Sequence, residues 1–246
     1  MRQGAHADFF YVKPEDVQGE AIFIIDQEWR HLRVVHRARV GQRFFAVDGL
    51  GHCFACELVR FAPDRAEAKI LQRWERCGEP RVHLTMASSP LRGERFDLLV
   101  EKCTELGVSR FILVRAARTQ PWAPGRMPRW QRVALAAMKQ CGRSVLPEVA
   151  QPVSFAQVVD AFPSSVLRLL AHEGEGAAPL MNLLKSLEQE QVPQAVVMVG
   201  PEGGFTPEEV QLAKRRGFVP VSLGTRRLRA ETAAIVAAAL VVAACG

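Results

Sequence analysis

A glycine-rich segment at residues 195–210, with the sequence AVVMVGPEGGFTPEEV, constrains the fold of this chain more than any other stretch. Its apolar start predicts a buried strand, and three glycines follow directly after that strand. Thr206 and Glu209 then form the Thr-x-x-Glu pattern of a capping box, and Pro207 occupies the first helical position. Glycines at the carboxyl end of a strand let the backbone approach a ligand closely. We therefore expect a strand, a ligand-binding loop and a helix.

This loop differs from the two common nucleotide-binding patterns. It does not have the spacing Gly-x-Gly-x-x-Gly, and it contains no Gly-Lys-Ser/Thr triplet. Both patterns place their glycines and lysine where a bound phosphate requires them. The loop is therefore neither a Rossmann fingerprint nor a nucleoside triphosphate loop, and a glycine-rich turn without a ligand is the alternative interpretation.

Strands and helices alternate from residue 82 onward. Apolar strand-length runs lie at 82–87, 111–115, 166–171, 195–199 and 219–223. Helical periodicity or helix signals lie at 95–106, 128–141, 155–162, 179–190, 207–216 and 230–244. Such alternation is typical of an α/β domain with a mostly parallel sheet. Because parallel strands end at one edge of a sheet, the loops after residues 171, 199 and 223 should converge on one crevice.

The N-terminal part has a different pattern. Short alternating or apolar runs at 9–12, 21–25, 43–47, 54–59 and 66–71 are separated by turn signals. One helical stretch, 27–36, interrupts them. These features predict a small β-barrel-like domain, with residues 73–80 as a linker. We expect two domains, at 1–75 and 80–246.

The formal net charge of +6 is concentrated in one segment. Residues 80–150 carry 12 basic and 5 acidic side chains, whereas residues 1–79 carry 12 of each. Between Arg110 and Arg143 there are eight basic residues and no acidic one, with Trp122 and Trp130 among them. Arginine binds phosphate through a planar fork and stacks on bases, so the segment predicts a nucleic-acid-binding surface. The alternative is a general preference for arginine, because the chain has 26 Arg and 6 Lys.

The composition and the apolar runs of the sequence argue against a disulfide-rich, secreted or membrane-spanning protein. Six cysteines in 246 residues are too few for a disulfide scaffold. No charged segment followed by an apolar one opens the chain, and the longest uncharged apolar run, 232–245, is too short to cross a bilayer. We expect a cytoplasmic protein. Cys53 and Cys56 beside His52 resemble half a zinc site, but no second ligand pair follows, so we expect no metal.

Two C-terminal segments carry a resemblance to a known family. GPEGGF at 200–205 and LGTRRLRAETA at 223–233 together resemble the C-terminal signature of the ribosomal small-subunit methyltransferase E family. EKCTELGV at 101–108 is similar to the family's Lys-Ala-Thr-Glu-Leu-Gly-Val helix end. Its other matches are Gln140, Arg143 and Pro147, and, in the N-terminal part, His31, Arg37, Gly41, Asp48, Gly49 and Gly51.

The resemblance implies a fold and an activity. The fold is α/β: a C-terminal SPOUT domain with a mostly parallel sheet and a trefoil knot, preceded by a small PUA-like β-barrel that binds RNA. The activity is methylation of N3 of a uridine in 16S rRNA of the small ribosomal subunit, with S-adenosyl-L-methionine as the methyl donor, by a homodimer. Two departures stand out. Asp8 occupies a position where many members have arginine, for which Arg2 is a substitute, and residues 91–94 replace a Lys-Gly-Asp-like turn.

The same resemblance assigns roles to individual residues. Arg229 is the candidate for stabilising the uracil anion or its phosphate, and Glu202 or Glu231 is the candidate base. A loop-bracing role for Glu202 and a helix-terminus role for Glu231 are the alternatives. The methyl-donor pocket is assigned to the backbone at Leu170, Gly200, Gly203, Leu223 and Leu228. His172 is a further candidate for contact with the donor or the substrate, with a structural role as the alternative. The RNA-binding set is Arg37, Arg115, Arg118, Arg129, Arg132 and Arg143.

Two other functions compete with this one. The first keeps the SPOUT fold and changes the target to another rRNA or tRNA nucleoside, including a ribose 2′-oxygen. The second is a non-catalytic RNA-binding protein, which would not bind the methyl donor. Binding of the methyl donor distinguishes a methyltransferase from a non-catalytic RNA-binding protein. Mapping of the modified nucleoside distinguishes methylation of uridine N3 from methylation of another nucleoside.

Overall fold

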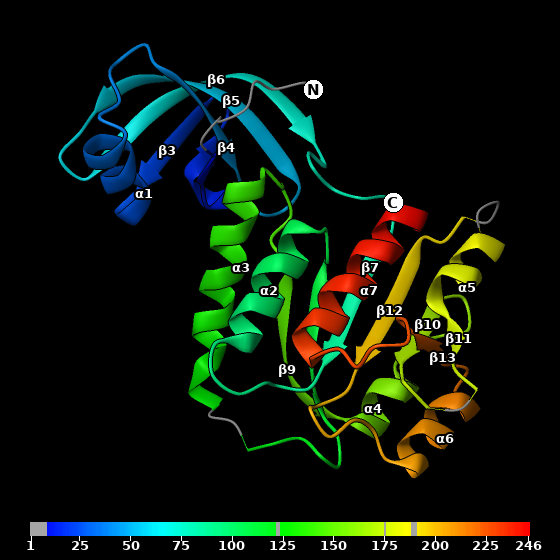
Figure 1. Ribbon diagram of the computed structural model, residues 1–246. Helices are drawn as coiled ribbons and strands as arrows, with labels where there is room; N and C mark the ends of the chain where they lie inside the picture. The colour runs from blue at the N-terminus through cyan, green and yellow to red at the C-terminus, as the bar shows by residue number, and fades with distance from the viewer. Residues whose placement is uncertain (1–8, 122–123, 175, 188–190) are drawn as a thin grey trace. The chain divides into compact units, whose positions relative to one another are not determined.

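The computed structural model describes residues 9–121, 124–174, 176–187 and 191–246, and the chain forms two compact units (Figure 1). The first unit comprises the described chain up to Glu79 together with Ala136–Leu146. The second unit comprises Pro80–Leu135 and Pro147–Gly246. Each unit is therefore made of two separate segments of the chain. The sequence predicted two continuous domains, at 1–75 and 80–246, and did not predict this exchange of segments.

The first unit is built on a six-stranded sheet in the order β1-β4-β5-β6-β3-β2. Its strands are β1 (Phe9–Tyr11), β2 (Val17–Gln18), β3 (Ala21–Ile25), β4 (Arg43–Val47), β5 (His52–Phe61) and β6 (Arg65–Glu75). All neighbours are antiparallel except β1 and β4. The five strands expected from the sequence are confirmed. Pairing of β6 with β5 continues to Glu75, so residues 73–75 are strand rather than linker.

The interior of this unit follows from alternation along its strands. Ile22 and Ile24 of β3 are fully buried, and their neighbours are more exposed. They pack with Phe10, Leu32 and Phe54 in one apolar cluster. The helical stretch expected at 27–36 is divided into α1 (Asp26–Arg30) and a π-helical turn, η2 (His31–Val35); a short 3-10 turn, η1 (Pro14–Asp16), precedes them.

The second unit is built on a seven-stranded sheet in the order β11-β13-β10-β12-β7-β8-β9, with every pair parallel. Its strands are β7 (His83–Ser88), β8 (Arg110–Arg115), β9 (Glu148–Ser154), β10 (Leu167–Ala171), β11 (Ala178–Pro179), β12 (Gln194–Val199) and β13 (Val219–Ser222). The predicted mostly parallel α/β sheet is confirmed. The edge strands β9 and β11 were not expected, because β9 has no continuous apolar run and contains Pro152, and β11 has only two residues, both exposed.

The six helices expected after residue 82 are also confirmed. They are α2 (Arg95–Glu105), α3 (Met127–Cys141), α4 (Phe155–Asp160), α5 (Leu180–Ser186), α6 (Pro207–Arg215) and α7 (Ala230–Cys245), with a 3-10 turn η3 (Pro124–Arg126) before α3. Within the second unit, α2, α5 and α7 lie on one face of the sheet and α4 and α6 on the other (Figure 1). The capping box of α6 is formed as predicted: Thr206 accepts from the Glu209 amide, and Glu209 accepts from the Thr206 amide.

The C-terminal helix α7 is apolar on nearly every side. Ala234, Ala237, Ala238 and Val241 are fully buried, and the helix packs against β7 and β12 as well as α2. Small alanine side chains allow this close packing. In the part of the chain that the structure describes, no helix combines the length and the apolarity that crossing a membrane requires.

Candidate functional site

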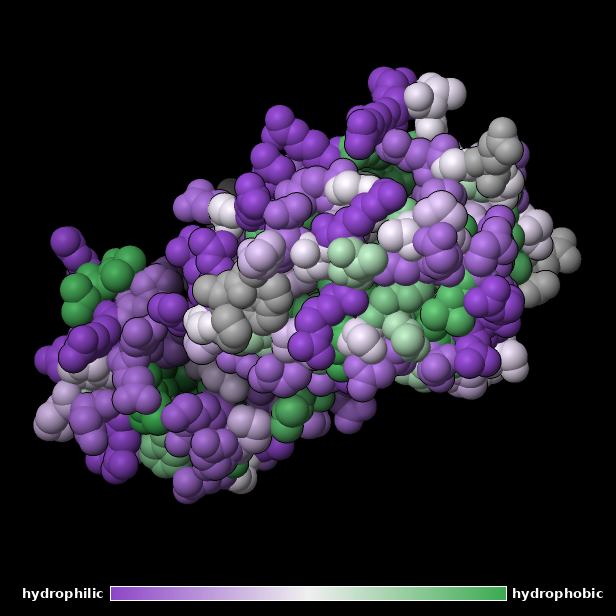
Figure 2. Space-filling model, turned by 90° about the horizontal axis from the view of Figure 1, so that it is seen from below, coloured by the Kyte–Doolittle hydropathy of each residue, from purple (hydrophilic) through white to green (hydrophobic). Residues whose placement is uncertain are grey.

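Three loops meet at the carboxyl edge of the second sheet. They follow β10, β12 and β13, which are neighbours in the order β13-β10-β12. Together they line a cavity of about 550 Å³, and Figure 2 looks onto this edge, where apolar surface is bordered by hydrophilic residues. The convergence expected from the sequence is confirmed. The volume is within the range of small-molecule sites, about 300–1,000 Å³.

The glycine-rich loop after β12 leaves little room for side chains at two positions. A Cβ at Gly200 would lie 3.2 Å from the ring of Phe205, and one at Gly203 would lie 3.3 Å from Cδ of Arg118. Arg118 in turn donates a hydrogen bond of 2.8 Å from Nη1 to the carbonyl oxygen of Gly203. Both glycines line the cavity, and Phe205 and Arg118 lie against the positions that side chains there would occupy.

The loop between β13 and α7 is anchored at both ends. At its start, the Ser222 hydroxyl donates to the carbonyl of Gly224 at 3.1 Å and accepts from the Gly224 amide at 3.3 Å. Gly224 has a φ of 123°, a conformation that side-chain-bearing residues rarely adopt. At its end, the Leu228 amide donates to Oε1 of Glu173 at 3.3 Å, which ties this loop to the loop after β10.

Two candidate acids face one arginine. Nη1 of Arg95 lies 3.4 Å from Oε1 of Glu202, and Nε of Arg95 lies 4.0 Å from Oε1 of Glu231. Glu202 is exposed and lines the cavity, whereas Glu231 is 5% exposed and does not line it. Within the described residues, Oε2 of Glu231 is buried without a hydrogen-bond partner. Of the two acids, only Glu202 can meet a molecule in the cavity directly.

The structure brings together most of the residues assigned to the methyl donor. His172, Gly200, Gly203, Leu223 and Leu228 line the cavity, as does Arg229. Leu170 does not: it is fully buried within β10 and faces the core on the side of α4 and α6. Burial, reinforced by the charge of Lys214, lowers the pKa of His172, so its imidazole is neutral at pH 7.

The residues assigned to RNA are scattered. Arg118 lines the cavity, and Arg37 and Arg115 are exposed elsewhere. Arg129 is bound to Asp97, with Nε 2.7 Å from Oδ2 of that carboxylate. The other oxygen of Asp97 accepts from the indole of Trp130 at 2.9 Å, and the fully buried ring of Trp130 cannot stack on a base. Arg132 donates to the carbonyl of Pro128.

Arg143 lies in the interior of the first unit. Its side chain is 2% exposed, and its guanidinium contacts the equally buried carboxylate of Glu79 at 2.7 Å. Glu79 also accepts from the amides of Ser144 and Val145. A buried, paired guanidinium cannot contact a phosphate on the surface, so we remove Arg143 from the RNA-binding set and assign it a structural role.

The cysteine pair in β5 is buried in the first unit. Burial raises the pKa of Cys53 and of Cys56 to about 12 each, so both remain thiols at neutral pH. Thiolate is the form that binds metals. Among the residues that the structure describes, no group of three or more His, Cys, Asp or Glu has the arrangement of a metal site. Arg2, Asp8 and Trp122 lie outside the described residues.

Sequence reasoning missed several residues of the cavity. Arg226 and Arg227 line it, although Arg229 is the only arginine of this segment to which the sequence assigned a role. Their position inside the C-terminal signature was a usable signal. Arg95 and Glu173 had no such signal, because their partners lie 107 and 55 residues away in the chain.

The comparisons with known proteins agree on one family. The family model described as RNA methyltransferase domain matches residues 78–242. The Ribosomal RNA small subunit methyltransferase E of Synechocystis is 33% identical over 93% of this chain and 75% of the relative. The protein of the same name from Mycobacterium bovis is 29% identical over 94% of this chain and 89% of the relative.

A solved structure gives the same result. The crystal structure of a Ribosomal RNA small subunit methyltransferase E from Neisseria gonorrhoeae, bound to S-adenosyl methionine, matches with a TM-score of 0.85 and 32% identity. The match covers 96% of this chain and 97% of that one. The similarity therefore spans both units rather than the second alone.

Proposed function

This chain belongs to the ribosomal RNA small subunit methyltransferase E family, and from that premise we propose that it transfers a methyl group from S-adenosyl-L-methionine to N3 of a uridine in 16S rRNA. One observation carries the proposal within the molecule: three strand-end loops form a single cavity with the glycine backbone exposed in its wall. The related protein from Neisseria gonorrhoeae, which was crystallised bound to S-adenosyl methionine, supports the choice of donor.

The residues of the cavity fit this donor. Because Phe205 and Arg118 lie close to Gly200 and Gly203, a side chain at either glycine would crowd the wall of the cavity. The backbone groups that line the cavity can hydrogen-bond the edge of an adenine ring. The cavity volume of about 550 Å³ accommodates a molecule of this size. We assign the contacts to His172, Gly200, Gly203, Leu223 and Leu228. When bound, the donor supplies a methyl group on a sulfonium, which transfers without a metal.

The chain's own residues have two tasks in this reaction. N3 of uracil is a weakly acidic imide and a poor nucleophile while it carries its proton, so the proton must leave and the resulting charge must be stabilised. We assign the base to Glu202, because it lines the cavity, and the stabilising cation to Arg229 at the start of α7. Glu231 is buried beside Arg95, and we assign it to holding Arg95 in place.

Other properties complete the proposal. We propose that the first unit is a PUA-like barrel that contacts the rRNA, with Arg37 on its surface. The second unit is a SPOUT domain with a trefoil knot, and α7 belongs to the interface of a homodimer in the bacterial cytoplasm. Family membership supports each assignment, and light scattering of the purified protein tests the dimer.

Two measurements test the function. Calorimetric titration with S-adenosyl-L-methionine should show saturable binding to the free protein or to its complex with RNA. Incubation with the donor and with small ribosomal subunits or free 16S rRNA, followed by mass spectrometry of nucleosides, should give 3-methyluridine. A methyl group on another base or on a ribose 2′-oxygen would overturn the target. Absence of donor binding with and without RNA would overturn the enzyme assignment.

A further inference from the structure

The arginines of the basic segment 110–143 are mostly held by partners within the protein. Their acceptors are backbone carbonyls or carboxylates: Gly203 for Arg118, Gly93 for Arg126, Asp97 for Arg129, Pro128 for Arg132 and Glu79 for Arg143. Although this segment has an excess of positive charge, few of its guanidinium groups are without a partner and free to bind RNA. The cations available to an RNA lie elsewhere.

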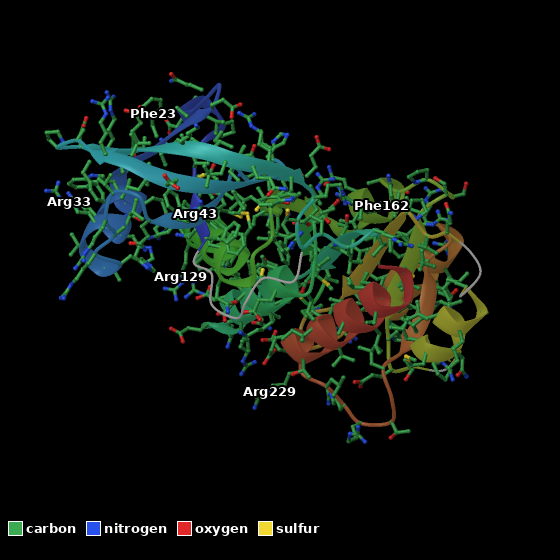
Figure 3. All side chains as sticks on the ribbon, turned by 90° about the horizontal axis from the view of Figure 1, so that it is seen from above. Phe23, Arg33, Arg43, Arg129, Phe162 and Arg229 are labelled. Carbon is green, nitrogen blue, oxygen red and sulfur yellow. The ribbon has the colours of Figure 1, made fainter. Side chains whose placement is uncertain are left out.

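Three such cations lie at the cavity, on the loop between β13 and α7. Arg226, Arg227 and Arg229 are all exposed and line the cavity. Throughout the described ranges, none of the three side chains has a hydrogen-bond or ion-pair partner. Figure 3 shows Arg229 at the start of α7, with the loop projecting from the body of the unit.

The carboxylates of the cavity wall do not compensate this charge. Glu202 already faces Arg95, and Glu173 accepts the Leu228 amide. The methyl donor does not compensate it either, because its sulfonium and ammonium groups outnumber its carboxylate at neutral pH. Unpaired guanidinium groups beside a cationic ligand repel it. The charge instead suits a polyanion that binds at the same cavity.

We propose that Arg226 and Arg227 form a clamp for the RNA phosphates that flank the methylated uridine. The inference rests on the proposed function and adds two substrate-binding residues to it. The loop is held at Gly224 and at Leu228, so little conformational entropy is lost when the two arginines between these positions bind. The planar fork of arginine binds two phosphate oxygens at once.

The clamp lies next to the residue that is assigned to the uracil base. Arg229, two residues beyond Arg227, is the cation assigned to the uracil, and α7 begins at Ala230. The N-terminal end of a helix carries partial positive charge that also attracts phosphate. Arg226 and Arg227 would therefore hold a nucleotide by its phosphates, with its base toward the cavity. Such phosphate contacts position the nucleotide but do not distinguish one base from another.

The double variant R226Q/R227Q tests the clamp in the full-length protein. Removing two phosphate contacts should raise the KM for small-subunit RNA by about tenfold or more and lower the slope of log KM against log salt by about one to two. The affinity for S-adenosyl-L-methionine, measured by calorimetry, should stay within about twofold of wild type, since the pair is assigned to RNA. R226K/R227K should retain the salt slope and recover part of the affinity, because lysine keeps the charge and loses the fork.

A matched control is R81Q/R215Q. Both residues are exposed in the second unit, lie outside the cavity lining and have no side-chain partner in the described part of the chain. This control removes the same charge and should leave the KM for RNA near wild type. An equal rise in KM for the control would overturn the clamp, because the effect would then reflect net charge alone.

Two further outcomes separate the clamp from the proposed function. Loss of donor affinity in R226Q/R227Q with an unchanged KM for RNA would overturn the clamp and place the arginines on the donor's carboxylate. Fluorescence anisotropy with labelled RNA, in the absence of donor, reports on the clamp even without turnover. Weaker RNA binding by R226Q/R227Q in a protein that binds no donor would support the clamp and overturn the methyltransferase assignment.

Discussion

Arg118 and Gly203 are joined by a hydrogen bond of 2.8 Å between residues 85 positions apart in the chain. The bond ties the segment after β8 to the glycine-rich loop after β12. The aliphatic part of Arg118 also lies against the position that a Cβ of Gly203 would occupy. The arginine therefore both braces the loop and limits which residue the loop can contain.

Gly203→Val should weaken binding of S-adenosyl-L-methionine by at least about tenfold, or about 1.4 kcal/mol, because the branched side chain displaces Arg118 and distorts the loop. Gly203→Ala should have a smaller effect, since a contact of 3.3 Å requires a shift of only a few tenths of an ångström. Calorimetry on both variants measures the difference. Gly125→Val is the control, because no atom lies within 4 Å of its Cβ position. Wild-type affinity in Gly203→Val would show that the loop does not bind the donor.

Arg95→Gln should lower kcat by about tenfold, with a smaller change in the KM for RNA. The variant removes the cation that faces both Glu202 and Glu231, so the assigned base loses its fixed orientation. Arg95→Lys should recover part of the activity, because a single ammonium group cannot reach both carboxylates equally well. Steady-state kinetics gives kcat and KM, and single-turnover kinetics shows whether the loss lies in the chemical step. Arg92→Gln serves as the control, since Arg92 contacts Gln120 and neither glutamate; equal losses in both variants would contradict the role of Arg95.

Asp97→Ala should lower the free energy of unfolding by about 1–3 kcal/mol, because it removes the carboxylate that accepts the hydrogen bond of the buried Trp130 indole. Urea denaturation measures this change. Asp97→Asn retains an acceptor for Trp130 and should cost less. If the two variants were equally unstable, the charge that faces Arg129 would matter more than the hydrogen bond to Trp130.

Glu79→Gln should destabilise the protein by about 3–5 kcal/mol, since it leaves the buried guanidinium of Arg143 without a counter-charge. The double variant Glu79→Gln with Arg143→Met should be more stable than the single variant, because it removes the uncompensated charge. Chemical denaturation of the wild type and both variants tests the order. RNA affinity of the folded double variant should match wild type; a loss would return Arg143 to the RNA-binding set.

His172 should make the stability of the protein fall as the pH drops below about 6.5. Its pKa is lowered in the folded state by burial and by Lys214, so the unfolded chain takes up the proton first and acid favours unfolding. The contribution is fully present above the unfolded pKa and is lost below it. His172→Asn should flatten this part of the pH profile, as urea denaturation at about pH 7 and about pH 5 can show. An unchanged profile would mean that other groups cause the pH dependence.

Local sequence signals were sufficient for most of the secondary structure. The capping box at Thr206 and the apolar runs of β7, β10 and β12 depend on residues close together in the chain, and the structure contains each of them. The edge strand β9 gave no such signal, because its apolar residues are interrupted by Gln151 and Pro152 and its pairing with β8 depends on residues far away in the chain.

The site was predictable only in part, because local sequence signals do not show which residues distant in the chain come into contact. The loops could be placed because parallel strands end at one edge of their sheet, a rule that needs no knowledge of packing. The partner of each arginine could not, since Arg143 and Glu79 are 64 residues apart and Arg95 and Glu202 are 107 apart. The sequence therefore does not show that the side chain of Arg143 is 2% exposed and that of Arg95 is 42% exposed.

The double passage of the chain through each unit has a consequence for synthesis. The first unit needs Ala136–Leu146, which supplies Arg143 to Glu79 and pairs Val145 with the turn at Gly49. A nascent chain that has emerged only to residue 79 therefore holds the carboxylate of Glu79 without its partner. The N-terminal unit cannot mature until residue 146 has left the ribosome, so Pro80–Leu135 of the second unit is already synthesised before the first unit completes its folding.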